Sequence, residues 1–205
     1  MPRNSTVKRD LSGFSLLEVS LVVAVGLILT AVSLPLMNNV IANMKLRASM
    51  TSVSGLLQNT RATAVQQNKT MTAKHFNRTT APYSLIYYVQ AATDASPFSA
   101  TDIQVWMEAP ITPYPAPTGV VAPAAIATSA LTFTPQSIDP TVPLYASFNS
   151  RGLPCVYAAG VCTNSGLIEY FKDNRIGGSG GWAAISVSPA GRVKRWFWSG
   201  SAWTE

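Results

Sequence analysis

The chain has 205 residues, of which 47% are hydrophobic and 12% are charged, and its formal net charge at pH 7 is +6. The hydrophobic content is ample for one domain with its own core, and the modest basic excess only hints at polyanion binding. One histidine and nine acidic residues leave little material for a catalytic centre. We therefore expect no enzyme activity, no cofactor and no metal.

The first forty residues hold a long apolar stretch behind a short polar leader. Between Val19 and Met44 there is no acidic or basic residue, and the apolar part is close to the roughly 20 residues that a helix needs to cross a bilayer. The leader, residues 1–13, carries three basic residues against one acidic residue, which predicts that it stays in the cytoplasm. We therefore predict a transmembrane helix over residues 14–37, with the rest of the chain exported.

Glu18 is the unexpected residue of this stretch, because an ionised carboxylate inside a bilayer is costly and normally marks a pairing or functional site. A secretory signal would have a shorter apolar run and a small-x-small cleavage site, for which only Val40 to Ala42 is a weak candidate. A plain uncleaved anchor is the other simple alternative. Neither explains the carboxylate, which is otherwise accounted for only as an interfacial side chain that reaches toward water.

The motif Gly-Phe-Ser-Leu-Leu-Glu, residues 13–18, resembles the processing site of type IV prepilins and of the pseudopilins of type II secretion. The resemblance implies that a prepilin peptidase cuts after Gly13 and methylates the new N-terminal residue, Phe14. Glu18 matches the family's glutamate, and Pro35 matches its helix-bending proline. After cleavage, the amine of Phe14 can pair with Glu18 of a neighbouring subunit, because two buried charges that neutralise each other cost less than either alone.

Residues 38–68 are predicted to continue the helix as an amphipathic segment whose apolar stripe packs on a sheet. The expected stripe comprises Val40, Ile41, Met44, Val53, Leu56, Leu57 and Val65. The segment 56–73 is similar to the end of the helix in minor pilins of the GspH/FimT type. The matching positions are Arg61, Ala64, Val65 and Asn68, and the Pro-x-Gly-Arg step at 189–192 is similar to the final hairpin of the same family.

Beyond residue 69, short runs rich in β-branched and aromatic residues alternate in polarity and end at turn-forming residues, which predicts strands. They cover residues 84–90, 102–108, 131–135, 144–149, 167–172, 182–188 and 192–198. Nine of the fourteen prolines lie within residues 91–143, which predicts a surface loop there. The expected fold class is α+β, a type IV pilin-like fold in which one long N-terminal helix packs on a C-terminal antiparallel β-sheet head, residues 69–205.

Cys155 and Cys162 are the two cysteines of the chain, and they enclose a short segment. In an oxidising compartment such a pair predicts a disulfide that pins a hairpin or a loop tip. A metal site is not expected, because the one histidine, His75, is distant in sequence and zinc takes three or four protein ligands. The glycine-rich run at 175–181 lacks the lysine of a phosphate-binding loop.

The stretch GRVKRWFW near the C-terminus interleaves cations with aromatic rings, a combination that holds phosphates and stacks on bases. In a regular strand, Arg192, Lys194, Trp196 and Trp198 fall on one face, with Arg195 on the other. Some minor pilins of DNA uptake carry a Gly-Arg-x-Arg motif that contacts DNA, and this stretch resembles it with a lysine at the second basic position. The five residues are candidate DNA contacts, and packing against a sheet edge or a neighbouring subunit is the alternative.

The resemblance implies a minor pilin or pseudopilin, anchored in the bacterial inner membrane by one span, with its head in the periplasm or outside the cell. It implies assembly into a type IV pilus or a type II secretion pseudopilus. The implied partners are prepilin peptidase, other pilin or pseudopilin subunits and the inner membrane. A DNA-binding minor pilin that contributes to DNA uptake is the alternative function, and DNA is then a further partner.

Overall fold

The structure, a computed structural model, describes residues 15–77, 82–115, 117, 136–138, 145–175 and 181–205, with the backbone alone at 32, 34–36, 77 and 136–138. The chain divides into two compact units, residues 1–40 and residues 41–205. We call the second the head unit, and every strand of the described chain belongs to it. Gly13 and Phe14, the predicted processing site, lie outside the described residues, as does the expected strand at 131–135.

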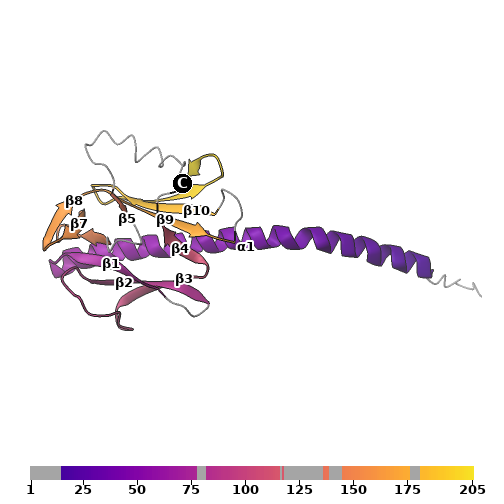
Figure 1. Cartoon of the computed structure of the whole chain (residues 1–205), viewed down its shortest axis with the longest axis horizontal. Coiled ribbons are helices and arrows are strands. Elements are labelled where there is room, and N and C mark those ends of the chain that lie inside the picture. The colour runs from indigo at the N-terminus through magenta and orange to yellow at the C-terminus, as the bar shows by residue number, and fades with distance from the viewer. Residues whose placement is uncertain (1–14, 78–81, 116, 118–135, 139–144, 176–180) are drawn as a thin grey trace, which may run out of the picture. The chain divides into compact units, whose positions relative to one another are not determined.

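One helix, α1, begins at Leu16 and ends at Gln67 (Figure 1). Ser15 caps its start, because the Ser15 hydroxyl accepts a hydrogen bond of 3.2 Å from the backbone N–H of Glu18. A left-handed residue, Asn68, follows its end with φ of 51°. The N–H groups of Asn68 and Lys69 then bond back to the carbonyls of Val65 and Ala64, which is the hydrogen-bond pattern of a Schellman motif.

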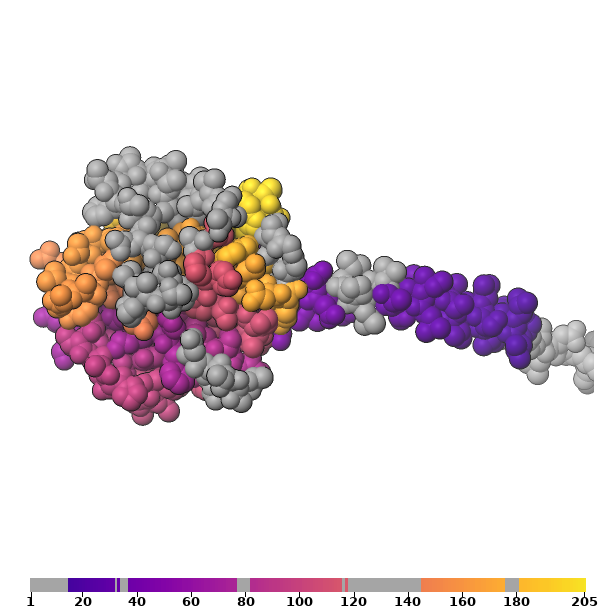
Figure 2. Space-filling model, viewed as in Figure 1, coloured from indigo at the N-terminus to yellow at the C-terminus, as the bar shows by residue number. Residues whose placement is uncertain are grey.

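The first part of α1, residues 16–31, exposes large apolar side chains along its whole length (Figure 2, indigo). These are Leu16, Leu17, Val19, Leu21, Val22, Val23, Val25, Leu27, Ile28 and Leu29, which are between 49% and 88% exposed. Among the described residues, no helix contains a stretch that is both long and apolar enough to cross a membrane, so the span expected over residues 14–37 is not supported.

The second part of α1, residues 41–67, buries one face in the core of the head unit. The buried stripe includes Leu46, Met50, Val53, Leu57 and Ala64, whose spacings of three, four and seven residues keep them on one side of a helix. The predicted stripe is therefore only partly correct. Val53, Leu56 and Leu57 are buried, whereas Val40, Ile41, Met44 and Val65 are exposed, because at about 100° per residue they lie away from the buried face.

The first sheet of the head unit contains six antiparallel strands in the order β3, β2, β1, β6, β7, β8. Its strands are β1 (Met71–Asn77), β2 (Tyr83–Ala91), β3 (Ile103–Glu108), β6 (Ala146–Phe148), β7 (Pro154–Ala158) and β8 (Val161–Asn164). The predicted strands at 84–90, 102–108 and 144–149 are confirmed within this sheet. The β7–β8 hairpin matches one of the two alternatives expected for the cysteine pair, a hairpin or a loop tip, whereas β1 was not predicted.

The second sheet has the order β12, β11, β10, β9, β4, and a further strand, β5, pairs with β9 in parallel. Its strands are β4 (Ile111–Tyr114), β5 (Gln136–Ile138), β9 (Leu167–Asp173), β10 (Trp182–Val187), β11 (Val193–Trp198) and β12 (Trp203–Thr204). The predicted antiparallel β-sheet head is therefore divided into two sheets, a division that the sequence did not predict. The chain crosses between the sheets three times, from β3 to β4, from β5 to β6 and from β8 to β9, and the two sheets lie on different sides of the helix (Figure 1).

The main core lies where the helix and the two sheets meet. Met50 and Leu57 of α1 pack in one cluster with Leu85 and Tyr87 of the first sheet and Phe171 of the second. This arrangement confirms the coarser expectation of an α+β fold with a helix packed on antiparallel strands.

Candidate functional site

The two faces of the basic strand β11 pack against different groups of residues. Val193 and Phe197 pack against the main core, where the helix lies, whereas Trp196 belongs to a second cluster with Trp182 and Tyr170 on the other side of the sheet. The predicted alternation is therefore observed. The five candidate DNA contacts consequently do not form one surface.

The two tryptophans of the predicted site are mainly packing residues. Trp196 is 7% exposed, and its indole N–H donates to the Ser186 hydroxyl at 2.9 Å. Trp198 is partly buried, and its ring centroid lies 5.4 Å from that of Trp203. Buried rings of this kind offer no open face to a nucleic-acid base, so the stacking role expected for Trp196 is not supported by its position.

Four cations line a groove between α1 and β11 with a volume of about 430 Å³. We call it the basic groove. Its lining residues are Arg47, Thr51, Arg192, Val193, Lys194, Arg195, Phe197 and Glu205. Four of these side chains are cationic and one is acidic, which gives the lining a formal charge of +3. Such a charge excess in a groove favours anions of the phosphate type.

Contacts between α1 and β11 hold two of these cations. A guanidinium nitrogen of Arg195 donates to the Thr51 hydroxyl at 2.7 Å, across 144 positions of sequence. The guanidinium of Arg47 lies over the Phe197 ring, 4.4 Å from its centroid, in a cation–π contact that occupies the flat face of the group. Sequence reasoning missed Arg47 and Thr51, because the sequence of a helical segment does not indicate which distant strand will lie beside it.

Lys194 is the best-partnered cation of the groove. Its ammonium group pairs with the Glu205 carboxylate, which is 55% exposed at its side chain, and it lies 5.2 Å from the centroid of the Trp196 ring. Arg192 is exposed, and its backbone N–H donates to the Ser188 hydroxyl at 3.1 Å. Arg192 therefore stands at the turn that precedes β11.

Arg61 holds the turn that carries Arg192. One guanidinium nitrogen of Arg61 donates to the carbonyl of Gly191 at 3.0 Å. Gly191 has φ of 83°, a backbone conformation that favours glycine, and a Cβ there would lie 2.9 Å from Cζ of Arg61, whose guanidinium would have to shift. Gly152, with φ of 75°, approaches Arg61 in a similar way from another loop. The structure therefore brings together Arg61 and the Pro-x-Gly-Arg step, which the resemblance had matched separately.

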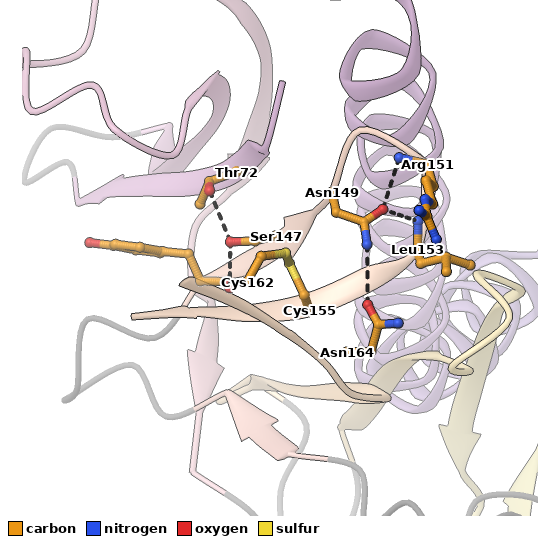
Figure 3. Close-up of a disulfide and its surroundings, with 9 residues drawn as sticks. Thr72, Ser147, Asn149, Arg151, Leu153, Cys155, Cys162 and Asn164 are labelled. Atoms are coloured by element: carbon orange, nitrogen blue, oxygen red, sulfur yellow. Dashed lines mark hydrogen bonds between the residues drawn. A yellow bond between two sulfur atoms is a disulfide. The ribbon is translucent and has the colours of Figure 1, made fainter. Parts of the chain in front are cut away.

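The predicted disulfide is confirmed. Cys155 of β7 and Cys162 of β8 are bonded, with their Cα atoms 5.4 Å apart, in a hairpin at one end of the first sheet (Figure 3). Asn149 secures the loop before this hairpin, because its side-chain oxygen accepts from the N–H groups of Arg151 and Leu153 at 2.9 and 3.0 Å. Its amide group also donates to Asn164 at 3.1 Å.

A buried acid joins the two sheets elsewhere in the head unit. Glu169 of β9 is 4% exposed, and the hydroxyl of Tyr87 in β2 bonds to its carboxylate. Burial raises the pKa of Glu169 to about 7. The same burial, together with the nearby carboxylate, raises the pKa of Tyr87 well above its usual value. His75, whose ring centroid is 6.0 Å from that of Tyr87, has a pKa lowered by burial. Sequence reasoning did not single out this trio.

The assembly residues predicted from the leader motif are only partly described. Glu18 is exposed in the first turn of α1, and Pro35 lies within the helix with its side chain outside the described residues. Within the described part of the chain, no group of three or more His, Cys, Asp or Glu side chains is placed to hold a metal ion.

Comparisons with known proteins give one structural likeness. No family model matches the chain, and no curated protein matches it. The type IV minor pilin FimU of Pseudomonas aeruginosa, strain PAO1, is similar in structure, with 15% sequence identity and a TM-score of 0.44. The match covers 80% of this chain and 95% of that one.

Proposed function

We propose that this chain is a pilin-like subunit, cut after Gly13 by a prepilin peptidase and assembled into a filament through the first part of α1. The exposed apolar surface of residues 16–31 carries the proposal. Each bulky aliphatic side chain left in water forgoes about 1.5 to 3 kcal/mol of burial. A surface of ten such side chains therefore calls for a covering partner, and helices of neighbouring subunits supply one.

Glu18 is the polar element of that proposed interface. The N-terminus of a helix carries a partial positive charge, and a free amine at Phe14 would add a full positive charge beside it. An acidic residue in the first turn offsets both. When the helices pack together and water leaves, Glu18 of one subunit pairs with the amine of the next, because an unpaired carboxylate at that depth would cost several kcal/mol.

Before assembly, the same apolar surface would be covered by the inner membrane, with the leader on the cytoplasmic side. The described helix has no stretch that is both long and apolar enough to cross a membrane, so this anchoring rests on the resemblance of the leader motif. Alkaline extraction of membranes from expressing cells tests it. Release of the full-length chain into the supernatant would contradict anchoring, and retention in the pellet would support it.

Co-expression with a prepilin peptidase and mass spectrometry of the N-terminus test the processing step. We expect a product that begins with methylated Phe14, and none from Gly13→Val, because the bulkier side chain blocks cleavage. A second arm compares incorporation into filaments for Glu18→Ala, Glu18→Gln and Ser20→Ala. The two Glu18 variants should assemble poorly and Ser20→Ala normally. Normal assembly of Glu18→Ala would contradict the pairing role.

The proposed filament is a type IV pilus or a type II secretion pseudopilus. The basic groove favours a second candidate function, a DNA-binding minor pilin that contributes to DNA uptake. Its support is the cluster of four cations from α1, β11 and the preceding turn. Salt-dependent binding of single-stranded DNA by the chain tests this function. If the chain does not bind DNA and cells that lack it lose type II secretion, the pseudopilus is favoured.

A further inference from the structure

Glu205 has the one acidic side chain among the eight lining residues of the basic groove. Its side chain meets the Lys194 ammonium directly, so it supplies to Lys194 the oxyanion that a bound phosphate would supply. The other three cations, Arg47, Arg192 and Arg195, have no acidic partner within that lining. The groove therefore contains both a place for an anion and an anionic side chain that already occupies part of it.

We propose that Glu205 is an intramolecular competitor for the phosphate site of the basic groove, so that a bound phosphate chain must displace Glu205 from Lys194. The inference rests on the second proposed function, DNA binding. It adds a residue that regulates binding, Glu205, and two helix residues that take part in the site, Arg47 and Thr51. The ligand class is a single-stranded nucleic acid, recognised through the oxyanions of its backbone.

The architecture of the groove favours a chain of phosphates over one isolated anion. Four cations reach it from α1, from the turn before β11 and from β11 itself, whereas one phosphate group needs fewer. Thr51 holds the guanidinium of Arg195, and Phe197 supports that of Arg47. Two of the cations are thus positioned before any ligand arrives, which lowers the ordering cost of binding.

The pairing between Lys194 and Glu205 is weak enough to be displaced. Both side chains are partly open to solvent, at 27% and 55%, and exposed ion pairs contribute little to stability because water and salt screen them. Neutralising Glu205 should therefore tighten DNA binding by only about two- to fivefold. An effect of that size suits a competitor that tunes affinity without abolishing it.

The test measures binding of a fluorescein-labelled single-stranded DNA of about 16 nucleotides to the full-length chain in a non-ionic detergent. Fluorescence anisotropy is recorded from about 50 to about 200 mM NaCl. Glu205→Gln is compared with Glu108→Gln, a matched control. Glu108 is also partly exposed, at 43%, and forms an ion pair with Lys45 at 2.7 Å, but it lies outside the basic groove. Both variants change the net charge by the same amount.

We expect Glu205→Gln to tighten binding about two- to fivefold at the lowest salt, and Glu108→Gln to change it by less than half as much. In a Lys194→Met background, the effect of Glu205→Gln should fall to that of the control, because the cation for which the two anions compete is gone. Thr51→Val and Arg47→Gln should each weaken binding, and Arg47→Gln should reduce the salt slope by about 0.7. Circular dichroism verifies that each variant is folded.

The outcomes separate the two proposals. If the wild-type chain binds DNA and Glu205→Gln behaves like Glu108→Gln, the competitor role is overturned and DNA binding stands. If Glu205→Gln keeps its full effect without Lys194, the competitor role is likewise overturned. If no variant binds DNA at the lowest salt, the DNA-binding function fails, and the competitor role fails with it.

Discussion

The two parts of helix α1 have the same backbone conformation but differ in how far their apolar side chains are buried. Residues 41–67 bury one stripe against two sheets, whereas residues 16–31 expose apolar side chains throughout. A helix that is hydrophobic all round is normally covered on every side. The difference indicates that the second part stabilises this chain, and that the first part is built for contacts outside it.

The largest effect should follow from truncating the buried stripe. Leu57 is 1% exposed, and replacing it by Ala should lower the free energy of unfolding of the head unit by about 2 to 5 kcal/mol. Leu27 is 65% exposed, so Leu27→Ala should leave that free energy unchanged. Urea unfolding of the full chain in detergent, followed by tryptophan fluorescence, makes the measurement. Equal losses in both variants would show that the two parts are not energetically distinct.

The buried carboxylate Glu169 makes the stability of the head unit depend on pH. Glu169 has a pKa of about 7 in the folded chain, against an ordinary value of 4.5. Between those values the folded chain holds a proton that the unfolded chain has lost, so stability falls as pH rises. The loss is on the order of 3 kcal/mol by about pH 7.

His75 contributes with the opposite sign. Its pKa is lowered on folding from 6.5, so the unfolded chain binds more protons below that value and stability rises with pH there.

The variant Glu169→Gln keeps an acceptor for the Tyr87 hydroxyl and removes the titration of the buried carboxyl group. Its midpoint temperature, measured by circular dichroism from about pH 5 to about pH 8, should no longer fall with pH. A wild-type profile that rises steadily across this range would contradict a protonated Glu169.

The contact between the second part of α1 and the β10–β11 turn gives a smaller prediction. Gly191→Ala should destabilise the head unit by about 1 to 3 kcal/mol, because the backbone has φ of 83° and the new Cβ would lie 2.9 Å from Cζ of Arg61. Gly200 is a control with φ of 101° and no atom within 4 Å of its Cβ position. A loss in Gly200→Ala as large as that in Gly191→Ala would show that strain alone, and not Arg61, sets the cost.

Local patterns in the sequence account for much of the fold. The helix, the disulfide and the strands that became β2, β3, β6, β9, β10 and β11 were predictable, because each depends on spacing within one short segment. The two-sheet arrangement was not, since it depends on where the chain crosses between the sheets, after β3, after β5 and after β8. β12 has two residues, which is too short for any periodic signal to appear.

The candidate site shows the same limit more sharply. The cations of β11 were visible as a run in the sequence. In the folded chain, however, Trp196 is buried and Arg47 of α1 joins the lining of the groove. Arg47 and Phe197 meet only in the folded chain, 150 positions apart. Contacts of this kind carry no local signature, so a basic run can indicate the charge of a site but not its full set of residues.

The smallest predicted effect comes from replacing one glycine by alanine in each of the two helix parts. Gly26 and Gly55 both lie inside α1 with no atom within 4 Å of their Cβ positions, so alanine fits at either one without strain. Alanine favours a helix interior over glycine by about 0.8 to 1 kcal/mol. Gly55→Ala should raise the free energy of unfolding of the head unit by about that amount, because folding of the unit includes residue 55.

Gly26→Ala should leave that free energy unchanged, because residue 26 belongs to the other compact unit. Urea unfolding under the same conditions measures both variants. A matching gain in Gly26→Ala would mean that the helix folds as one cooperative element with the head, and that the first part contributes to stability as well as to contacts with partners. A gain in Gly55→Ala alone would localise the cooperative unit to residues 41–205, which leaves the apolar first part free to serve assembly.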